Sequence, residues 1–292
     1  MRKPVFTGSA VAIITPFTGD GVDYNKLEEL IEFQIKEGTD AILICGTTGE
    51  SSTMPDEEHL SVIKFAIDKV AKRRPVIAGT GTNDTRHAIE LSKSAESFGA
   101  DAVLTVAPYY NKTSQKGLYE HFKAIAQSIS TPVILYNVPA RTNLNISAET
   151  IKALSEIDNI VAVKECNFHQ VGDIVNMCGP DFAVYSGEDA LVVPLMSMGG
   201  LGVISVMANI IPAKTHNMVK KFLGGDIAGS RDIQLELLEL IKALFSDVSP
   251  MPIKAAMNMM GMNVGKCRMP LVEISDKTAE MLKKALKSCN LI

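Results

Sequence analysis

Lys164 is the clearest candidate for a reactive side chain in this 292-residue chain, because it ends the apolar run Ile160-Val-Ala-Val-Lys164. A lysine at the end of a buried strand either pairs with a carboxylate or acts as an amine nucleophile. Partial desolvation would lower its pKa and leave a neutral amine that attacks a carbonyl carbon to form a Schiff base. A structural ion pair with Glu188 or Asp189 is the alternative, and the position alone leaves both interpretations open.

Tyrosines end or follow two other apolar runs. Tyr136 ends the run at residues 133–136, and its phenol could move protons to and from a carbinolamine if it faced the Lys164 amine. An ordinary packed tyrosine is the alternative. Tyr109 and Tyr110 are consecutive, so in extended structure their side chains point to opposite sides. One of them could face a pocket while the other faces its rim or a partner.

Two loops offer groups that bind carboxylates. The segment Gly46-Thr-Thr-Gly-Glu50 places consecutive backbone N–H groups and two hydroxyls in a tight turn, which is an arrangement that suits an anion. Arg141 follows Pro139 in another loop and could hold a second carboxylate with two parallel hydrogen bonds. A merely structural turn and a solvated surface arginine are the respective alternatives.

Eight short β-branched runs position these residues, and longer amphipathic stretches such as 24–37, 56–72, 85–98 and 117–128 lie between them. Each run is apolar on both faces, as parallel strands covered by helices require. This alternation predicts a (β/α)8 TIM barrel, with a doubly wound sheet as the alternative. In a barrel, active groups gather at the carboxyl ends of the strands. The runs are residues 11–14, 41–44, 76–78, 102–106, 133–136, 160–164, 183–185 and 203–206.

The pattern changes after the eighth run, where only helical periods such as 233–245 and 278–286 remain. We therefore expect a catalytic barrel at residues 1–224 and a helical C-terminal extension at residues 225–292. Gly224-Gly225 marks a helix end at this boundary. The uncharged stretch 190–213 contains several Pro and Gly residues, so it predicts a helix, a turn and a buried strand and not a membrane span.

Composition and spacing exclude several classes of function. The net charge of −4 provides no basic surface for nucleic acid. The five cysteines form no CxxC pair, which fits a reducing cytoplasm. The five histidines show no metal-binding spacing, and Gly79-Thr-Gly81 lacks the third glycine of a dinucleotide site. We expect a cytoplasmic protein without a metal, a nucleic-acid partner or a membrane segment.

Taken together, the motifs resemble the dihydrodipicolinate synthase family of pyruvate-dependent class I aldolases. They are Gly46-Thr-Thr-Gly-Glu50, Tyr136-Asn-Val-Pro-Ala-Arg141, Lys164-Glu165 and Gly202-Val-Ile-Ser-Val206, and the resemblance runs from about Gly8 to the C-terminus. It implies that Lys164 forms an imine with pyruvate without a cofactor. The derived enamine would add to L-aspartate 4-semialdehyde, in the first committed step of diaminopimelate and lysine biosynthesis.

The resemblance also implies a role for individual residues. Tyr136, Thr47 and Tyr110 match a proton relay in which Tyr110 is donated across a dimer interface, and a homotetramer of two tight dimers is expected. Thr47 and Thr48 would hold the pyruvate carboxylate. The other positions matched to substrate binding are Arg141, which would hold the semialdehyde carboxylate, and Gly187 and Ile204, whose backbone lines the pocket.

One region departs from the family pattern. In relatives inhibited by lysine, the effector pocket lies at the dimer interface. Those relatives commonly have His where this chain has Asp56, and Glu where it has His87. Loss of a carboxylate that pairs with the effector's ammonium removes a charge-assisted hydrogen bond, so we expect weak or absent inhibition by lysine. The other residues at the matching positions are Ser51, Ser52, His59, Asn83 and Tyr109.

Two alternative functions share the fold. N-acetylneuraminate lyase and 2-keto-3-deoxy sugar acid aldolases have the same lysine and tyrosine. The lyase usually has Ser where this chain has Thr47 and lacks the loop arginine, so Thr47 with Arg141 favours the synthase. A silent barrel that acts as a ligand sensor or scaffold would have lost the amine or the relay, whereas Lys164, Tyr136 and Tyr110 are all present.

Overall fold

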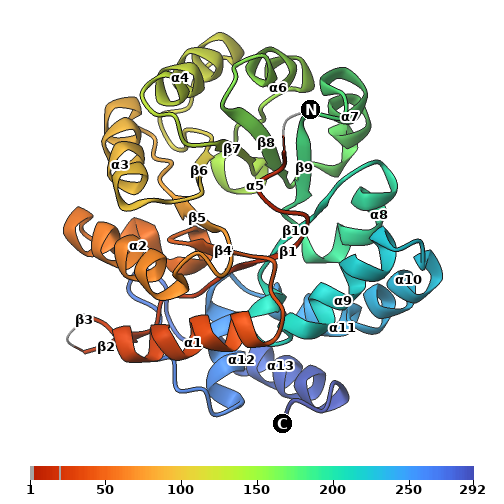
Figure 1. The fold of residues 1–292 in the computed structure, drawn as a ribbon. Helices are drawn as coiled ribbons and strands as arrows, with labels where there is room; N and C mark the ends of the chain where they lie inside the picture. Colours follow the sequence, from red (N-terminus) through yellow and green to blue (C-terminus); the bar gives the residue numbers. More distant parts are fainter. Residues whose placement is uncertain (1–2, 20) are drawn as a thin grey trace.

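The computed structural model describes residues 3–19 and 21–292. Eight parallel strands close into a barrel in the order β1-β10-β9-β8-β7-β6-β5-β4, and helices surround it (Figure 1). The predicted (β/α)8 barrel is confirmed. The strands are β1 (Gly8–Ala12), β4 (Ala41–Ile44), β5 (Val76–Gly79), β6 (Ala102–Val106), β7 (Val133–Asn137), β8 (Ile160–Glu165), β9 (Ala183–Ser186) and β10 (Gly202–Ser205), and a separate small hairpin is formed by β2 (Phe17–Thr18) and β3 (Gly21–Val22).

The first strand lies earlier than the sequence predicts. We expected residues 11–14, whereas β1 spans Gly8–Ala12. Gly8 pairs in register with Gly202 of β10, and a Cβ on Gly202 would lie 1.8 Å from the Gly8 carbonyl oxygen. Two glycines at this seam allow the strands to approach closely. Because glycine carries no β-strand signal of its own, the pattern of branched residues missed the start of the strand.

Two stacked aromatic rings join the segment before β1 to β9. The Phe6 and Tyr185 rings are stacked with their centroids 4.2 Å apart, and the Tyr185 hydroxyl donates to the Phe6 carbonyl oxygen at 2.7 Å. Both side chains are buried.

The helices around the barrel begin with side-chain caps in several cases. Asp23, Asp84, Ser114 and Ser147 each accept a backbone N–H from the first turn of the helix that follows. The helices are α1 (Tyr24–Lys36), α2 (Asp56–Val70), α3 (Thr85–Phe98), α4 (Gln115–Gln127), α5 (Pro139–Thr142), α6 (Ala148–Ser155), α7 (Val171–Cys178), α8 (Val192–Ser197) and α9 (Pro212–Leu223). Single 3-10 turns are η1 (Thr47–Gly49), η2 (Ser51–Thr53), η3 (Phe168–Gln170), η4 (Asp189–Leu191) and η5 (Met207–Asn209).

Four further helices follow α9: α10 (Ile227–Glu236), α11 (Leu238–Leu244), α12 (Met251–Met259) and α13 (Asp276–Ser288). The single helical period predicted at residues 233–245 is divided between α10 and α11. Buried Leu237, Leu240 and Leu244 continue the apolar period across the break. No glycine or proline lies at this point to mark the end of a helix in the sequence. The boundary between a barrel of residues 1–224 and an extension of residues 225–292 stays a prediction.

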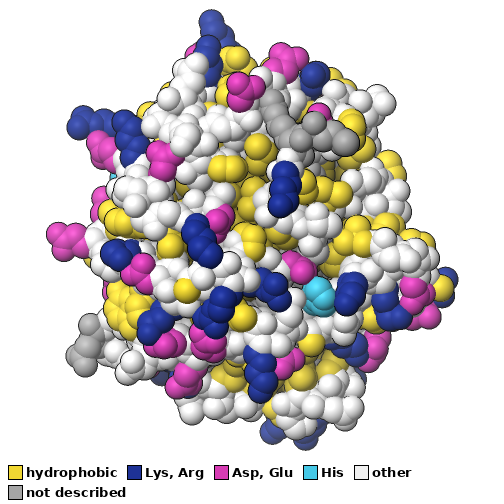
Figure 2. Space-filling view, in the orientation of Figure 1, with side chains coloured by type: hydrophobic (Ala, Val, Ile, Leu, Met, Phe, Trp, Pro, Cys, Tyr) yellow, Lys and Arg dark blue, Asp and Glu magenta, His cyan; other side chains and the backbone are white. Residues whose placement is uncertain are grey.

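The uncharged stretch 190–213 forms α8, a glycine turn and the buried strand β10, as predicted. In the part of the chain that the structure describes, no helix is both long and apolar enough to cross a membrane. On the face shown in Figure 2, Lys and Arg side chains are interspersed with Asp and Glu side chains. That face therefore presents no continuous basic surface.

Candidate active site

Lys164 and Tyr136 lie side by side at the carboxyl ends of neighbouring strands. They are paired in register on β8 and β7, and the Lys164 Nζ atom lies 4.4 Å from the centroid of the Tyr136 ring. Both side chains are buried, with 5% and 6% exposed. The barrel thus removes the amine and the phenol from bulk water and places them within reach of one small molecule.

Lys164 has no carboxylate partner among the residues that the structure describes. The Asp189 carboxylate accepts hydrogen bonds from two backbone N–H groups at 2.9 and 3.0 Å, and the Glu188 carboxylate accepts a hydrogen bond from the Cys166 thiol. Burial lowers the pKa of Lys164 below the usual 10.5, against the opposing effect of Cys166 and of these carboxylates. The ion-pair alternative is not observed, and the geometry favours a neutral amine.

Glu165, on the opposite face of the same strand, differs from Lys164 because its side chain has several hydrogen-bond partners. Its carboxylate accepts hydrogen bonds from Asn137 Nδ2 at 2.8 Å, from the Asn167 N–H at 2.6 Å and from Gln170 Nε2 at 2.8 Å. Desolvation nevertheless raises its pKa to about 7. Strand alternation therefore places Lys164 in the barrel interior and Glu165 on the other face, among polar groups that hydrogen-bond to its carboxylate.

Tyr136 is linked to the turn after β4, because its hydroxyl is hydrogen-bonded to the Thr47 side chain. Burial raises the pKa of Tyr136, so the phenol stays protonated at neutral pH. Within the turn at residues 46–50, the Gly49 N–H donates to the Gly46 carbonyl at 3.0 Å and the Glu50 N–H donates to the Thr47 carbonyl at 3.1 Å. An anion at this turn would therefore be held by the N–H groups of Thr47 and Thr48 and by their hydroxyls.

Gly187, Ile204 and Arg141 are the remaining candidates for substrate binding, and of these only Arg141 lines the cavity that contains Thr47. Gly187 lies against the lysine, since a Cβ there would be 2.4 Å from Cys166 Sγ and 3.2 Å from Lys164 Cε. Ile204 is fully buried on β10. Arg141, in α5, donates from its guanidinium to the Ser249 carbonyl at 3.0 Å. Arg141 and Thr47 line a cavity of about 380 Å³.

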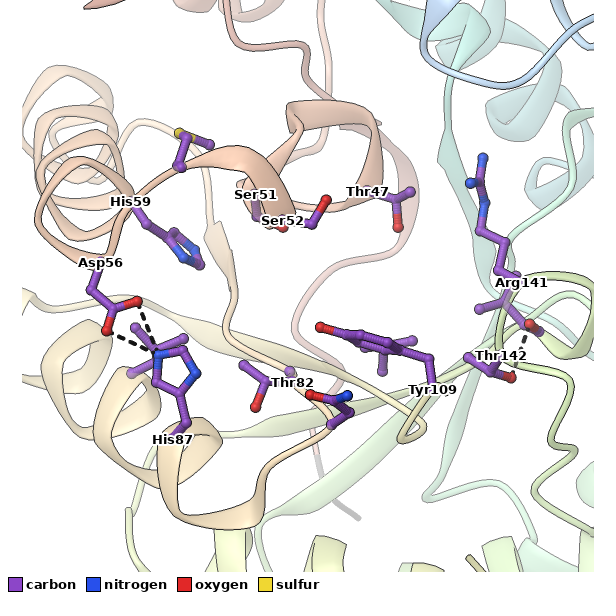
Figure 3. A pocket seen from close by; sticks show the side chains of 16 residues that line it. Thr47, Ser51, Ser52, Asp56, His59, Thr82, His87, Tyr109, Arg141 and Thr142 are labelled. Carbon is purple, nitrogen blue, oxygen red and sulfur yellow. Dashed lines mark hydrogen bonds and ion pairs between the residues drawn. The ribbon is translucent and has the colours of Figure 1, made fainter. Parts of the chain in front are cut away.

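Figure 3 shows this cavity, which continues from Thr47 and Arg141 to the residues matched to the effector position. At its far end His87 Nε2 lies 3.0 Å from Asp56 Oδ1, as a hydrogen bond between α3 and α2. The other residues of the expected effector position, all of which line the same cavity, are Ser51, Ser52, His59, Asn83 and Tyr109.

Tyr110 is not brought into the site by this chain. It has a left-handed backbone with a φ of 65°, its side chain is 92% exposed, and it does not line the cavity. Tyr109 lines the cavity instead. The two tyrosines do face different surroundings, but the backbone at Tyr110 is left-handed and not extended, so strand alternation is not the reason.

A buried ion pair beside the site was missed by the sequence reasoning. Lys254 Nζ lies 2.6 Å from Glu50 Oε1, with 2% and 1% of the two side chains exposed. The available signal was that Lys254 is the only charged residue within residues 248–265. No cluster of three or more His, Cys, Asp or Glu side chains in residues 3–19 and 21–292 has the geometry of a metal site.

Comparisons with known proteins agree with this geometry. The model of the dihydrodipicolinate synthetase family matches residues 5–289. The chain is 68% identical to a 4-hydroxy-tetrahydrodipicolinate synthase of Acetivibrio thermocellus over 100% of both chains. It is 47% identical to the Aquifex aeolicus dihydrodipicolinate synthase in its crystal structure, with a TM-score of 0.96 and 98% and 99% of the two chains covered. The enzyme of Cyanidioschyzon merolae with lysine bound is 40% identical, with a TM-score of 0.96 and 99% and 100% covered.

Two buried lysines with opposite surroundings give a direct test of the site's electrostatics. Replacement of the unpaired amine in Lys164→Met should raise the free energy of unfolding by roughly 1–3 kcal/mol, because it removes a desolvation cost. Lys254→Met should lower it by about 3–5 kcal/mol, because it leaves the Glu50 carboxylate buried and uncompensated. Chemical denaturation of both variants beside the wild type measures the two effects.

The gain in Lys164→Met should also depend on pH. The folded-state pKa of Lys164 lies below its unfolded value, so the unfolded chain binds more protons and the cost of burial is greatest at lower pH. The difference between variant and wild type should shrink as the pH rises toward 10.5. A gain that grows with pH, or a loss of stability in Lys164→Met, would contradict an unpaired buried amine.

Proposed function

The chain belongs to the dihydrodipicolinate synthetase family, and on that premise we propose that it condenses pyruvate with L-aspartate 4-semialdehyde through a Schiff base on Lys164. It is an enzyme of the class I aldolase type, a lyase that acts in lysine and diaminopimelate biosynthesis. The observation that carries the mechanism is the buried Lys164 amine, which has no carboxylate partner within residues 3–19 and 21–292 and lies 4.4 Å from the centroid of the Tyr136 ring.

The first step is attack of the Lys164 amine on the keto carbon of pyruvate. The C–N bond forms as the carbonyl π bond breaks, and the carbinolamine then loses its hydroxyl as water. Tyr136 supplies the proton for this loss, because its raised pKa keeps the phenol protonated and the hydrogen bond to Thr47 orients its hydroxyl. The 46–50 turn holds the pyruvate carboxylate through Thr47 and Thr48, while Gly187 leaves room beside the lysine.

The imine then serves as the electron sink, so the proposed mechanism needs no cofactor. Loss of a methyl proton gives an enamine, whose carbon adds to the aldehyde of the second substrate. Arg141 binds the carboxylate of that substrate, since its guanidinium lines the same cavity as Thr47. The amine of the semialdehyde replaces the Lys164 nitrogen in the imine, which closes the ring and releases the lysine.

An oligomer is part of the proposal. Tyr110 is 92% exposed and lies outside the site of its own chain. We assign it to the proton relay of a neighbouring subunit, in a cytoplasmic homotetramer built from two tight dimers. In that arrangement Tyr110 would be covered by the partner and would reach its Thr47.

Turnover with both substrates tests the assignment. Product formation from pyruvate and L-aspartate semialdehyde, followed through NADPH loss in the downstream reductase, should be rapid in the wild type and absent in Lys164→Ala. Arg141→Ala should raise KM for the semialdehyde more than KM for pyruvate. Absence of turnover in the folded wild type, together with cleavage of N-acetylneuraminate or a 2-keto-3-deoxy sugar acid, would assign the chain to a sister activity.

Hybrid oligomers test the role of Tyr110. Tyr110→Phe should lower kcat strongly, because it removes one proton carrier. Mixing it with inactive Lys164→Ala should restore activity, since a hybrid dimer then has one site with both Lys164 and Tyr110. Subunit exchange is verified by mass spectrometry of differently labelled chains. Verified exchange without any recovery would contradict a site shared between subunits.

Inhibition by lysine tests the departure at Asp56 and His87. The Asp56 carboxylate is already engaged by His87, so an effector ammonium would have to displace the imidazole. Wild-type turnover should therefore resist submillimolar lysine. The exchange Asp56→His with His87→Glu should increase sensitivity roughly 10- to 100-fold, by restoring one charge-assisted hydrogen bond. Submillimolar inhibition of the wild type would refute this expectation.

A further inference from the structure

We propose that Glu50 and Lys254 are positioning residues through which the C-terminal helices hold the 46–50 turn in its substrate-binding shape. The inference rests on the proposed function, because that function assigns the pyruvate carboxylate to this turn. It gives the C-terminal segment a part in substrate binding, in addition to its packing against the barrel.

The Glu50 carboxylate is held by residues from the C-terminal part of the chain. Lys254 Nζ on α12 lies 2.6 Å from Oε1, and the Arg268 backbone N–H donates to Oε2 at 2.8 Å. The Cys267 thiol also hydrogen-bonds to this carboxylate. These partners are more than 200 residues away in sequence, so the contact joins the turn after β4 to the part of the chain that follows β10.

Lys254 and Arg268 make further contacts that hold this part of the chain beside the turn. Lys254 Nζ donates to the Lys266 carbonyl at 3.1 Å and lies 4.3 Å from the centroid of the Phe17 ring. The Arg268 guanidinium lies 4.1 Å from the same ring and pairs with Glu58 on α2. The Lys254 ammonium is therefore fixed in direction, which fixes the Glu50 side chain in turn.

The backbone of Glu50 transmits this constraint to the substrate-binding groups. Its N–H donates to the Thr47 carbonyl at 3.1 Å, and its carbonyl accepts the Thr53 N–H and hydroxyl at 3.1 and 3.0 Å. Glu50 also has a left-handed φ of 56°, which a non-glycine residue adopts at a cost. A free carboxylate would relax this residue and so shift the Thr47 carbonyl.

The second substrate-binding group touches the same part of the chain. Arg141 donates to the Ser249 carbonyl at 3.0 Å, just before α12 begins at Met251. Both groups assigned to the substrate carboxylates therefore have contacts to the C-terminal segment. Stability alone does not explain a buried ion pair, because apolar residues of similar volume are often equally stabilising.

The double variant Glu50→Gln with Lys254→Met tests the proposal. It removes both charges and keeps the side-chain volumes, so its melting temperature should stay near that of the wild type. KM for pyruvate should rise roughly 10- to 100-fold, because the turn loses its alignment, while KM for the semialdehyde changes less. Amide hydrogen exchange in residues 46–53 should become faster in the ligand-free enzyme.

A matched control lies among the C-terminal helices. The exposed pair Lys242 and Glu239 on α11, with 65% and 77% of the side chains exposed, is removed in the double variant Lys242→Ala with Glu239→Ala. This control should keep both wild-type KM values and wild-type exchange. If the Glu50 and Lys254 double variant matches the control in pyruvate KM and in exchange, the proposal is overturned.

Two further outcomes are covered by the design. If the double variant melts early, Glu50→Asp is measured instead, which keeps the charge but withdraws the carboxylate. Unchanged exchange and unchanged pyruvate KM in that variant overturn the proposal equally. If the wild type shows no turnover, the proposed function fails, whereas the exchange comparison in residues 46–53 still decides whether Glu50 and Lys254 hold the turn.

Discussion

An amine buried without a counterion is the constraint on which this site depends. The interior face of β8 ends in Lys164, and the two nearby carboxylates have other partners: Asp189 accepts backbone N–H groups and Glu188 accepts a thiol. An ammonium in this position would keep its desolvation cost, so the neutral form is favoured. Lys254 is equally buried and desolvation lowers its pKa as well, but it lies 2.6 Å from Glu50 Oε1, and the Glu50 carboxylate opposes that shift.

The barrel supplies the other requirements of the reaction from the same geometry. Parallel pairing of β7 with β8 sets Tyr136 beside Lys164, and the turn after β4 brings Thr47 to the phenol. The strands fix the amine and the phenol, whereas the groups proposed to bind the substrate carboxylates lie in the turn η1 and in α5. Both segments contact the C-terminal part of the chain, through Glu50 in one case and Arg141 in the other. In the proposed site, the strands fix Lys164 and Tyr136, whereas the groups that would bind the substrate carboxylates contact distant parts of the chain.

Sequence reasoning succeeded where local pattern determines structure. Consecutive parallel strands are neighbours in a barrel, so the adjacency of Tyr136 and Lys164 followed from two apolar runs, and alternation separated Lys164 from Glu165. It failed where the signal is not local. Gly8 begins β1 opposite Gly202, which lies 194 residues further along the chain, and the break between α10 and α11 occurs inside a continuous apolar period. The ion pair of Glu50 with Lys254 joins residues that are 204 positions apart in the chain, which no periodicity reveals.

The most direct test of the account is to identify the residue that reacts with pyruvate. The enzyme is treated with pyruvate and sodium borohydride, digested, and the modified peptide is located by mass spectrometry. The account predicts one reduced pyruvate adduct per chain on Lys164, and none when borohydride or pyruvate is omitted. An adduct on Lys254 or on a surface lysine, with Lys164 unmodified, would contradict the claim that the unpaired buried amine is the nucleophile.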